Sequence, residues 1–241
     1  MSAKGHDRVL LITGASSGIG AATARAAKAA GYRLALVSRS GADSGDGATD
    51  GSNDDRTLRL SADVTSWPQL TAATDATVAT FGRIDAVFAN AGIAAGAWSF
   101  IEGEPTPDAW RTMIDTNVLG CALTARAVMP HLLASKGRLV LTGSVLGRYP
   151  MAGSLYSATK HAVFGIADVL RAELSGTGVS VSIVEPGPVA TAFNPSLTDP
   201  DQAPTPLLQA DDVARMVVFV LDQPQGVDVN ELLLRPHGAT P

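Results

Sequence analysis

The 241-residue chain has one cysteine, few aromatic residues and little excess charge. Cys121 alone can form neither an intramolecular disulfide nor a thiolate metal cluster. Eighteen Lys and Arg residues against 23 Asp and Glu residues give a net charge of -5, without any basic cluster that would favour nucleic acid. No apolar run approaches the ~20 residues that span a bilayer, and residues 1–8 lack the apolar core of a signal peptide. We therefore expect a cytoplasmic protein without a membrane partner, a nucleic-acid partner or a metal site.

Hydrophobic residues make up 46% of the chain, which is enough for a large core. Short apolar runs alternate with longer Ala-rich stretches that have helical character. The predicted strands lie near residues 8–13, 33–38, 57–62, 84–89, 137–142, 179–184 and 230–235. The predicted helices lie at 18–31, 66–82, 106–134, 154–175 and 210–222. Nearly all-apolar strands in this alternation are typical of a parallel sheet covered on both faces. We predict one doubly wound α/β domain over residues 1–241.

Two segments depart from this pattern. Residues 40–56 contain four Gly and five Asp but no large apolar residue, so they cannot supply the apolar stripe of a packed helix. We predict a mobile, solvated acidic loop there; the spacing of its Asp residues leaves a metal site as the alternative. Residues 191–209, rich in Pro, Thr and Asp, follow a strand and are predicted to form a loop at the substrate.

The first predicted strand runs into Gly14-Ala15-Ser16-Ser17-Gly18-Ile19-Gly20 and then into a helix. Glycines at such a turn let the backbone approach a pyrophosphate, and the helix N-terminus favours the phosphates electrostatically. Ser16 and Ser17 add hydroxyl donors. The pattern predicts a dinucleotide site, and a tight turn without a ligand is the alternative.

The end of the second predicted strand indicates which dinucleotide is bound. An acidic residue there binds the ribose 2′-hydroxyl of NAD, whereas a basic residue favours the 2′-phosphate of NADP. Here Ser38 and Arg39 offer no carboxylate, and the Arg39 guanidinium suits a phosphate. We predict NADP in preference to NAD. An ordinary exposed arginine, neutralised by Asp43 and Asp46, is the alternative.

Tyr156 and Lys160 lie one turn apart at the start of a predicted helix, so they share a face. A neighbouring cation lowers the pKa of a phenol from about 10, which makes the tyrosine a usable general acid or base. Ser144 follows a strand upstream, where its hydroxyl could bind a substrate oxygen. A surface pair without chemistry and an ordinary turn serine are the alternatives.

These residues, in this order, resemble the short-chain dehydrogenase/reductase family over essentially the whole chain. The family motifs match the glycine turn at residues 13–20, Asp63-Val64, Asn90-Ala91-Gly92, Asn117, Ser144, Tyr156, Lys160, Pro186-Gly187, Val189 and Thr191. The resemblance implies a Rossmann-type sheet of seven parallel strands in the order 3-2-1-4-5-6-7. Residues 229–236 are also similar to a subgroup of NADP-dependent hydroxy-acid and short-chain alcohol dehydrogenases.

The resemblance also implies a role for each matched residue. Tyr156 would exchange a proton with the substrate oxygen, and Lys160 would lower the pKa of Tyr156 and hold the nicotinamide ribose. Ser144 would orient the substrate. Asn117 would bend or hydrate its helix and carry a water that links Lys160 to solvent. The cofactor contacts implied are adenine at Asp63 and Val64 and the nicotinamide carboxamide at Val189 and Thr191.

Three features differ from the family pattern. Ala89 stands where the family has a first asparagine before Asn90. The spacing from Ser144 to Tyr156 is one residue shorter than expected. The segment 40–56 replaces a crossover helix.

The substrate pocket is expected to use largely apolar residues that flank the catalytic positions: Ala94, Val145, Tyr149, Met151 and Phe193. They favour a small to medium, mostly uncharged alcohol or carbonyl substrate. Arg148 would either bind a substrate carboxylate or face solvent.

An NADP-dependent oxidoreductase is thus the leading hypothesis. A catalytically silent, dinucleotide-sensing regulator on the same fold is the alternative, although a sensor need not keep Ser144, Tyr156 and Lys160. A non-redox isomerase or dehydratase is a third, but such enzymes tend to be longer. The resemblance also implies a homotetramer, with a dimer next, in which helices 106–134 and 154–175 build a dimer interface.

Overall fold

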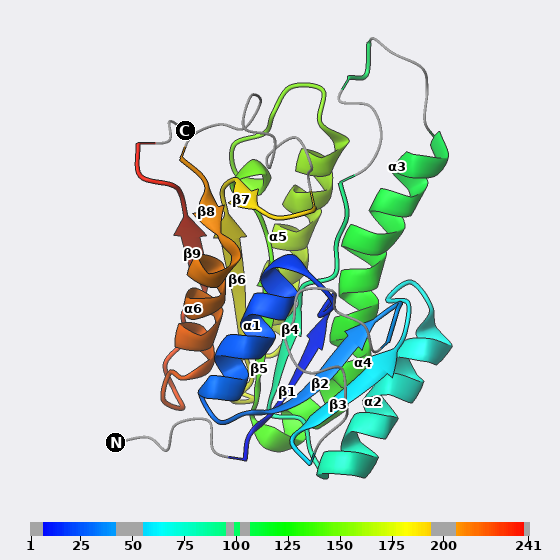
Figure 1. Ribbon diagram of the computed structural model, residues 1–241, viewed down its shortest axis with the longest axis vertical. Helices are drawn as coiled ribbons and strands as arrows, with labels where there is room; N and C mark the ends of the chain where they lie inside the picture. Colours follow the sequence, from blue (N-terminus) through cyan, green and yellow to red (C-terminus); the bar gives the residue numbers. More distant parts are fainter. Residues whose placement is uncertain (1–6, 42–54, 95–98, 102–106, 194–205, 239–241) are drawn as a thin grey trace.

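The computed structural model describes residues 7–41, 55–94, 99–101, 107–193 and 206–238, which form a sheet between two layers of helices (Figure 1). The strands of the main sheet are β1 (Val9–Thr13), β2 (Arg33–Ser38), β3 (Thr57–Ser61), β4 (Ala86–Ala89), β5 (Arg138–Thr142), β6 (Ser180–Pro186) and β9 (Glu231–Leu234). The helices are α1 (Gly18–Ala29), α2 (Trp67–Phe81), α3 (Pro107–Ile114), α4 (Gly120–Ser135), α5 (Leu155–Glu173) and α6 (Ala210–Leu221). Each predicted strand and helix is therefore present.

The seven strands pair in parallel in the order β3-β2-β1-β4-β5-β6-β9. Because β9 is the seventh strand of this sheet, the predicted order 3-2-1-4-5-6-7 and the α/β class are confirmed. Strands β2 and β3 are added on one side of β1, and strands β4, β5, β6 and β9 are added on its other side. Such a reversal leaves a crevice at the carboxyl ends of β1 and β4, where doubly wound folds bind ligands.

Alternate residues of each central strand pack on opposite helical layers. In β1, Leu11 joins a cluster with α4 and α5, whereas Leu10 and Ile12 join one with α1 and α6. All three side chains are at most 2% exposed. Full burial of such a side chain contributes roughly 1.5–3 kcal/mol, so the two-sided burial of the apolar strands holds the sheet between the layers.

The long predicted helix at 106–134 is interrupted. A five-residue π-helical stretch, Asp115–Leu119, separates α3 from α4. Among the described residues, Pro107–Ser135 is the one continuous helical stretch that is long and apolar enough to cross a membrane by length and composition. The stretch nevertheless contains a buried Asn117, and its residues Val128 and Leu132 belong to the core beneath the sheet.

A second, two-stranded pairing was not predicted from the sequence. β7 (Val189–Ala190) pairs in parallel with β8 (Leu208–Gln209) and so joins the two ends of the predicted substrate loop. Most of that loop, and most of the predicted acidic loop 40–56, lies outside the described residues.

Candidate active site

A cavity of about 1110 Å3 opens at the carboxyl ends of the central strands. It is lined by the turn after β1 and by the segments that follow β2, β3, β4, β5 and β6. The predicted cofactor residues found in its wall are Gly14, Ser16, Ser17, Gly18, Ile19, Ser38, Arg39, Asp63, Val64, Asn90, Ala91, Gly92, Tyr156, Lys160, Pro186, Gly187, Val189 and Thr191. Residues from across the sequence thus meet in one crevice.

The glycine turn requires glycine for steric reasons. Gly14 and Gly18 have φ values of +66° and +53°, which side-chain-bearing residues adopt at a cost. Gly20 does not line the cavity; a Cβ there would lie 2.1 Å from the carbonyl oxygen of Gly14. Gly20 therefore lets α1 pack against the turn.

The start of α1 suits an anionic ligand. The side chain of Ser17, at the N-cap, makes no capping hydrogen bond, and the first turn of α1 contains no acidic residue. The positive end of this helix thus faces a cavity wall built from Ser16, Ser17, Gly18 and Ile19. This donor set and the space left by the glycines fit the pyrophosphate of a dinucleotide.

Asn90, in the wall of the cavity, joins the ends of three strands. Its Nδ2 donates to the carbonyl oxygens of Thr13 and Gly14, both at 3.2 Å, and its Oδ1 accepts from the Thr142 hydroxyl at 3.3 Å. The backbone amides of Asn90 and Ala91 donate to the Thr13 hydroxyl. Asn90 therefore holds the glycine turn in place although Ala89 replaces the family's other asparagine.

Arg39 and Asp63 line the end of the cavity at which the adenosine is predicted. Asp63 Oδ1 accepts from the backbone amide and the hydroxyl of Thr65, at 2.9 and 2.8 Å. These hydrogen bonds, with a smaller contribution from the Arg39 charge, hold the pKa of Asp63 below its usual value. Asp63 thus shapes the turn after β3 as well as the cavity wall.

Tyr156, Ser144 and Lys160 come together in the opposite wall of the cavity. Lys160 Nζ lies 5.5 Å from the centroid of the Tyr156 ring and donates to the Thr142 carbonyl oxygen at 2.7 Å. Ser144 and Tyr156 both line this wall, and the Ser144 hydroxyl lies near enough to the Tyr156 phenol to lower its pKa. The shorter spacing between these two residues therefore does not separate them.

The protonation of this pair differs from the sequence prediction. Desolvation raises the pKa of Tyr156 above its usual value, and the group that lowers it is the Ser144 hydroxyl. Lys160, only 4% exposed, has its own pKa lowered to about 8 by burial. The predicted acidification of Tyr156 by Lys160 is not found, because burial disfavours both charged forms and the Lys160 ammonium donates to the Thr142 carbonyl oxygen.

Asn117 lies behind the cavity, in the π-helical stretch. Its Oδ1 accepts from the Ile93 amide at 2.8 Å, and its Nδ2 donates to the Ile93 carbonyl and to the Thr159 hydroxyl at 2.9 and 3.1 Å. The side chain thus clamps the segment after β4 to α5 where its own helix changes pitch. The water link to Lys160 stays a prediction.

Four of the predicted substrate residues, Ala94, Val145, Met151 and Phe193, line the catalytic end of the cavity. The Phe193 ring meets the Tyr156 ring edge-on, with centroids 5.8 Å apart. Tyr149 does not line the cavity: it is 48% exposed, and the Arg235 guanidinium lies 4.7 Å from its ring centroid. The reason is that the turn after Ser144 directs it outward.

Several residues of the cavity wall were not predicted. They lie next to motif residues in the sequence or one helical turn away, which is the signal that could have found them: Ala62, Thr65, Ile93, Thr112, Asp115, Thr116, Thr142, Gly143, Leu146, Ala152, Pro188 and Ala192.

Arg148 follows neither sequence alternative. Its Nε and Nη2 donate to the carboxylate of Glu185, and Nη2 also donates to Glu231 on β9. The Arg148 guanidinium is therefore engaged within the protein, and it is not in the cavity wall.

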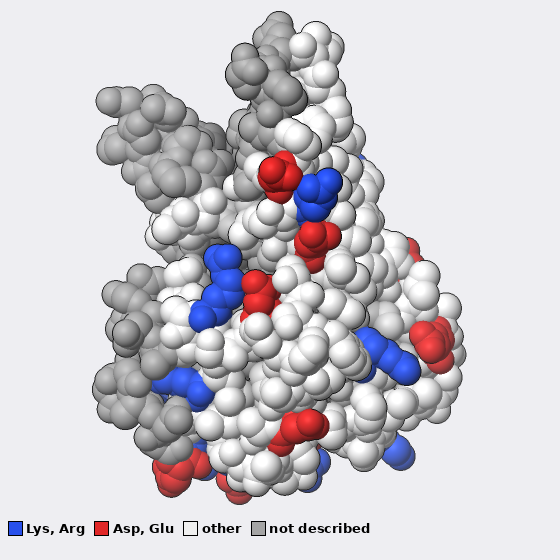
Figure 2. All heavy atoms as spheres, turned by 90° about the vertical axis from the view of Figure 1, so that its right-hand side faces the viewer, with Lys and Arg blue, Asp and Glu red and all other residues white. Residues whose placement is uncertain are grey.

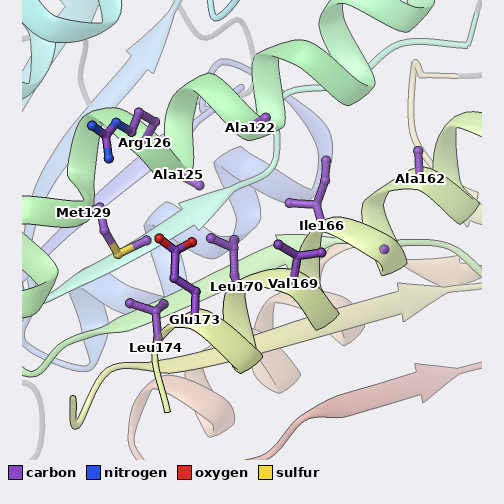
Figure 3. A pocket seen from close by; sticks show the side chains of 11 residues that line it. Ala122, Ala125, Arg126, Met129, Ala162, Ile166, Val169, Leu170, Glu173 and Leu174 are labelled. Carbon is purple, nitrogen blue, oxygen red and sulfur yellow. The ribbon is translucent and has the colours of Figure 1, made fainter. Parts of the chain in front are cut away.

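A second hollow, of about 450 Å3, lies on the outer face of α4 and α5 (Figure 3). Side chains of both helices point into it, among them Met129 and Ile166. Val169 at its edge is 65% exposed. An exposed apolar groove of this kind is typical of a protein contact surface.

The charges of the surface are dispersed. On the face in Figure 2, described Lys and Arg side chains lie singly among acidic and uncharged residues. Within the described part of the chain, no group of three or more His, Cys, Asp and Glu residues is placed to hold a metal ion.

Comparison with known proteins extends over nearly the whole chain. A family model described as short chain dehydrogenase matches residues 8–202. An uncharacterized oxidoreductase of Staphylococcus saprophyticus is 34% identical over 235 residues, which cover 96% of this chain and 98% of that protein.

Two solved structures are similar in fold. One is an alcohol dehydrogenase from the archaeon Thermococcus sibiricus complexed with 5-hydroxy-NADP, with a TM-score of 0.83, 28% identity and coverage of 97% and 98% of the two chains. The other is a 3-ketoacyl-(acyl-carrier-protein) reductase from Brucella melitensis complexed with NADH, with a TM-score of 0.81, 25% identity and coverage of 96% and 98%.

Proposed function

This chain belongs to the short-chain dehydrogenase/reductase family, and we propose that it is an NADP-dependent oxidoreductase that interconverts an alcohol and a carbonyl. The observation that carries the proposal is the meeting of Ser144, Tyr156 and Lys160 in the wall of the cavity that the glycine turn opens into. A protein that only sensed a dinucleotide would have no use for a proton donor there.

The bound dinucleotide supplies or accepts the hydride. Ser16, Ser17 and the amides at the start of α1 would hold its pyrophosphate, and Lys160 would hold the nicotinamide ribose. Its adenine would lie at Asp63 and Val64, and its carboxamide at Val189 and Thr191.

Tyr156 performs the proton transfer in this proposal. In the reductive direction its hydroxyl gives a proton to the substrate oxygen, and in the oxidative direction its phenolate takes one. The Ser144 hydroxyl hydrogen-bonds the same oxygen and stabilises its developing charge. The raised pKa of Tyr156 keeps its hydroxyl protonated at neutral pH, which is the form that gives a proton to the oxygen of a carbonyl substrate.

The residues at the catalytic end of the cavity indicate the class of substrate. Val145, Met151 and Phe193 give it an apolar wall. Because Arg148 is engaged by Glu185, it is not available to bind a substrate carboxylate. We therefore propose a small to medium, mostly uncharged aldehyde or ketone.

The direct test follows the absorbance at 340 nm for oxidation of NADPH with a panel of aldehydes and ketones and for reduction of NADP+ with a panel of hydroxy acids. Turnover of an uncharged carbonyl compound supports the proposal. Tight NADPH binding without turnover of any member would indicate the regulator instead.

The choice of NADP depends on Arg39. Replacing Arg39 with Ala should weaken NADPH binding by about 10- to 100-fold, because a charge-assisted hydrogen bond to phosphate contributes about 1.5–3 kcal/mol. NADH binding should change by less than about threefold. Both affinities can be measured by titrating the fluorescence of the reduced cofactor.

The matched control is Arg25→Ala, which removes an arginine that pairs with Asp211 on the surface of α1 and α6. It should leave both affinities unchanged. Tighter binding of NADH than of NADPH by the wild-type chain would contradict the assignment of NADP.

We also propose that the chain is a homotetramer, with the groove of α4 and α5 as one contact between copies. Val169→Glu would place a carboxylate at the edge of this apolar surface. In a two-fold symmetric contact, each of the two copies would bury one such carboxylate. The dissociation constant of that contact should rise by at least about 100-fold. Light scattering coupled to size exclusion would show a smaller species.

Val227→Glu provides the control for assembly. Val227 is 41% exposed and lies far from the groove in sequence, after α6. This variant should keep the wild-type mass. A wild-type chain that is monomeric, or equal masses for wild type and Val169→Glu, would contradict the proposed contact.

A further inference from the structure

The catalytic serine begins a short turn whose other end is Arg148. Ser144 Oγ accepts from the Leu146 amide at 3.1 Å, and the Arg148 amide donates to the Val145 carbonyl at 3.0 Å. The turn also packs tightly on α5, because a Cβ on Gly147 would lie 2.5 Å from the Phe164 ring. The orientation of Ser144 therefore depends on how this turn is held.

Arg148 ties the turn to the end of β6. Its guanidinium donates two hydrogen bonds to Glu185, one of them at 2.9 Å, and lies 5.1 Å from the centroid of the Phe164 ring. The Glu185 side chain is 0% exposed, and Arg148 is the group that pairs with it. A fully buried carboxylate demands such a partner, so this link is strongly specified.

Glu185 occupies a place that matters to the serine. It directly precedes Pro186, whose carbonyl oxygen accepts from the Ser144 hydroxyl at 3.5 Å. Its Cγ also lies 3.3 Å from where a Cβ of Gly143 would stand. Both ends of the Arg148–Glu185 pair are thus attached to backbone that surrounds Ser144.

We propose that Arg148 is a positioning residue for catalysis, which with Glu185 fixes the turn of residues 145–148 so that the Ser144 hydroxyl faces Tyr156. The expected effect of Arg148 on kcat rests on the proposed function. Since Arg148 does not line the cavity, its effect on turnover passes through Ser144.

Arg148→Lys tests the geometry while it keeps the charge. Lysine is a single-point donor and cannot make the two parallel hydrogen bonds that fix the turn. With a carbonyl compound that the wild-type chain reduces, kcat should fall by about 10-fold, while the KM for NADPH should change by less than about twofold. Glu185→Gln, which alters the same link from its other end, should give the same result and serves if Arg148→Lys does not fold.

The decisive comparison repeats Arg148→Lys in a Ser144→Ala background. If Arg148 acts by orienting Ser144, the substitution has no further effect once the hydroxyl is gone. An equal loss in both backgrounds would show a merely structural role and overturn the proposal. Arg171→Lys is the matched control: Arg171 lies near the same Glu231, at 3.8 Å, but does not contact the turn. It should lower kcat by less than about twofold.

Hydrogen exchange provides a readout that needs no substrate. In Arg148→Lys, amides of residues 144–149 should exchange at least about 10-fold faster than in wild type, and the glycine turn after β1 should not change. Unchanged exchange in 144–149 would refute the positioning role. If no carbonyl compound is reduced by wild type, the proposed function fails, and this measurement still decides the role of Arg148 in holding the turn.

Discussion

Replacing Tyr156 with Phe should lower kcat by about 10³-fold and leave the affinity for NADPH within about threefold of wild type. A positioned general acid contributes typically 10²–10⁴ to a rate, and the substitution removes only the hydroxyl. The edge-on contact with the Phe193 ring needs no hydroxyl, so the wall of the cavity should persist. Steady-state rates and a fluorescence titration of NADPH would provide the two numbers.

Tyr149→Phe is the natural comparison. It makes the same chemical change five residues after Ser144, on a ring that is 48% exposed and outside the cavity. Its kcat should stay within about twofold of wild type. Full activity in Tyr156→Phe, or an equal loss in both variants, would refute proton transfer by Tyr156.

Replacing Lys160 with Met should lower kcat by about 100-fold or more and yet stabilise the fold at neutral pH. The Met side chain has nearly the same length as that of Lys but carries no charge, so its burial does not remove an ammonium from water. A pKa lowered from 10.5 to about 8 corresponds to a penalty of about 3 kcal/mol for burying the ammonium. Loss of the hydrogen bond to the Thr142 carbonyl offsets about 1 kcal/mol of the gain.

The stability difference should depend on pH in a defined direction. Between pH 8 and 10.5 the unfolded chain binds a proton at Lys160 that the folded chain does not, so wild-type stability rises with pH relative to the variant. Below pH 8 the full penalty applies. The advantage of Lys160→Met should therefore shrink by about 2 kcal/mol from pH 7 to pH 10, as measured by urea denaturation.

Lys28→Met provides the reference for this experiment. It removes an exposed ammonium from α1 instead of a buried one. Because this side chain is exposed in the folded chain, its removal should change the dependence of stability on pH far less than removal of Lys160. A Lys160→Met variant whose stability difference from wild type varies with pH no more than that of Lys28→Met would mean that Lys160 is hydrated in solution.

The fold could be predicted from the sequence because its signals are local. The runs Val9–Thr13 and Arg33–Ser38 are buried nearly throughout, and each is followed by a turn rich in small residues or by a helix. The family resemblance implied a bend at Asn117, but the local sequence does not show that it takes the form of a π-helical stretch. The side chain of Asn117 makes two hydrogen bonds there to Ile93, which is 24 residues away.

Some features of the candidate site could likewise be predicted from the local sequence, and others could not. Gly14, Gly18 and Tyr156 reach the cavity because each sits at a strand end or helix start whose place in the sheet is fixed. The position of the Arg148 guanidinium depends instead on its hydrogen bonds to Glu185 and Glu231, which are 37 and 83 residues away. The protonation of Tyr156 also depended on burial, which spacing along a helix does not report.

The change of pitch between α3 and α4 has a consequence for how such a chain can diverge. One extra residue in a helical turn shifts the phase of everything beyond it by about 100°. Here Thr112, before the shift, lines the cavity, whereas Met129, after it, lines the outer groove. Residues before the π-helical stretch therefore face the cavity, and residues after it face the groove between α4 and α5. Substitutions that retune substrate choice can accumulate before this stretch while the residues after it keep the sequence that their own surroundings demand.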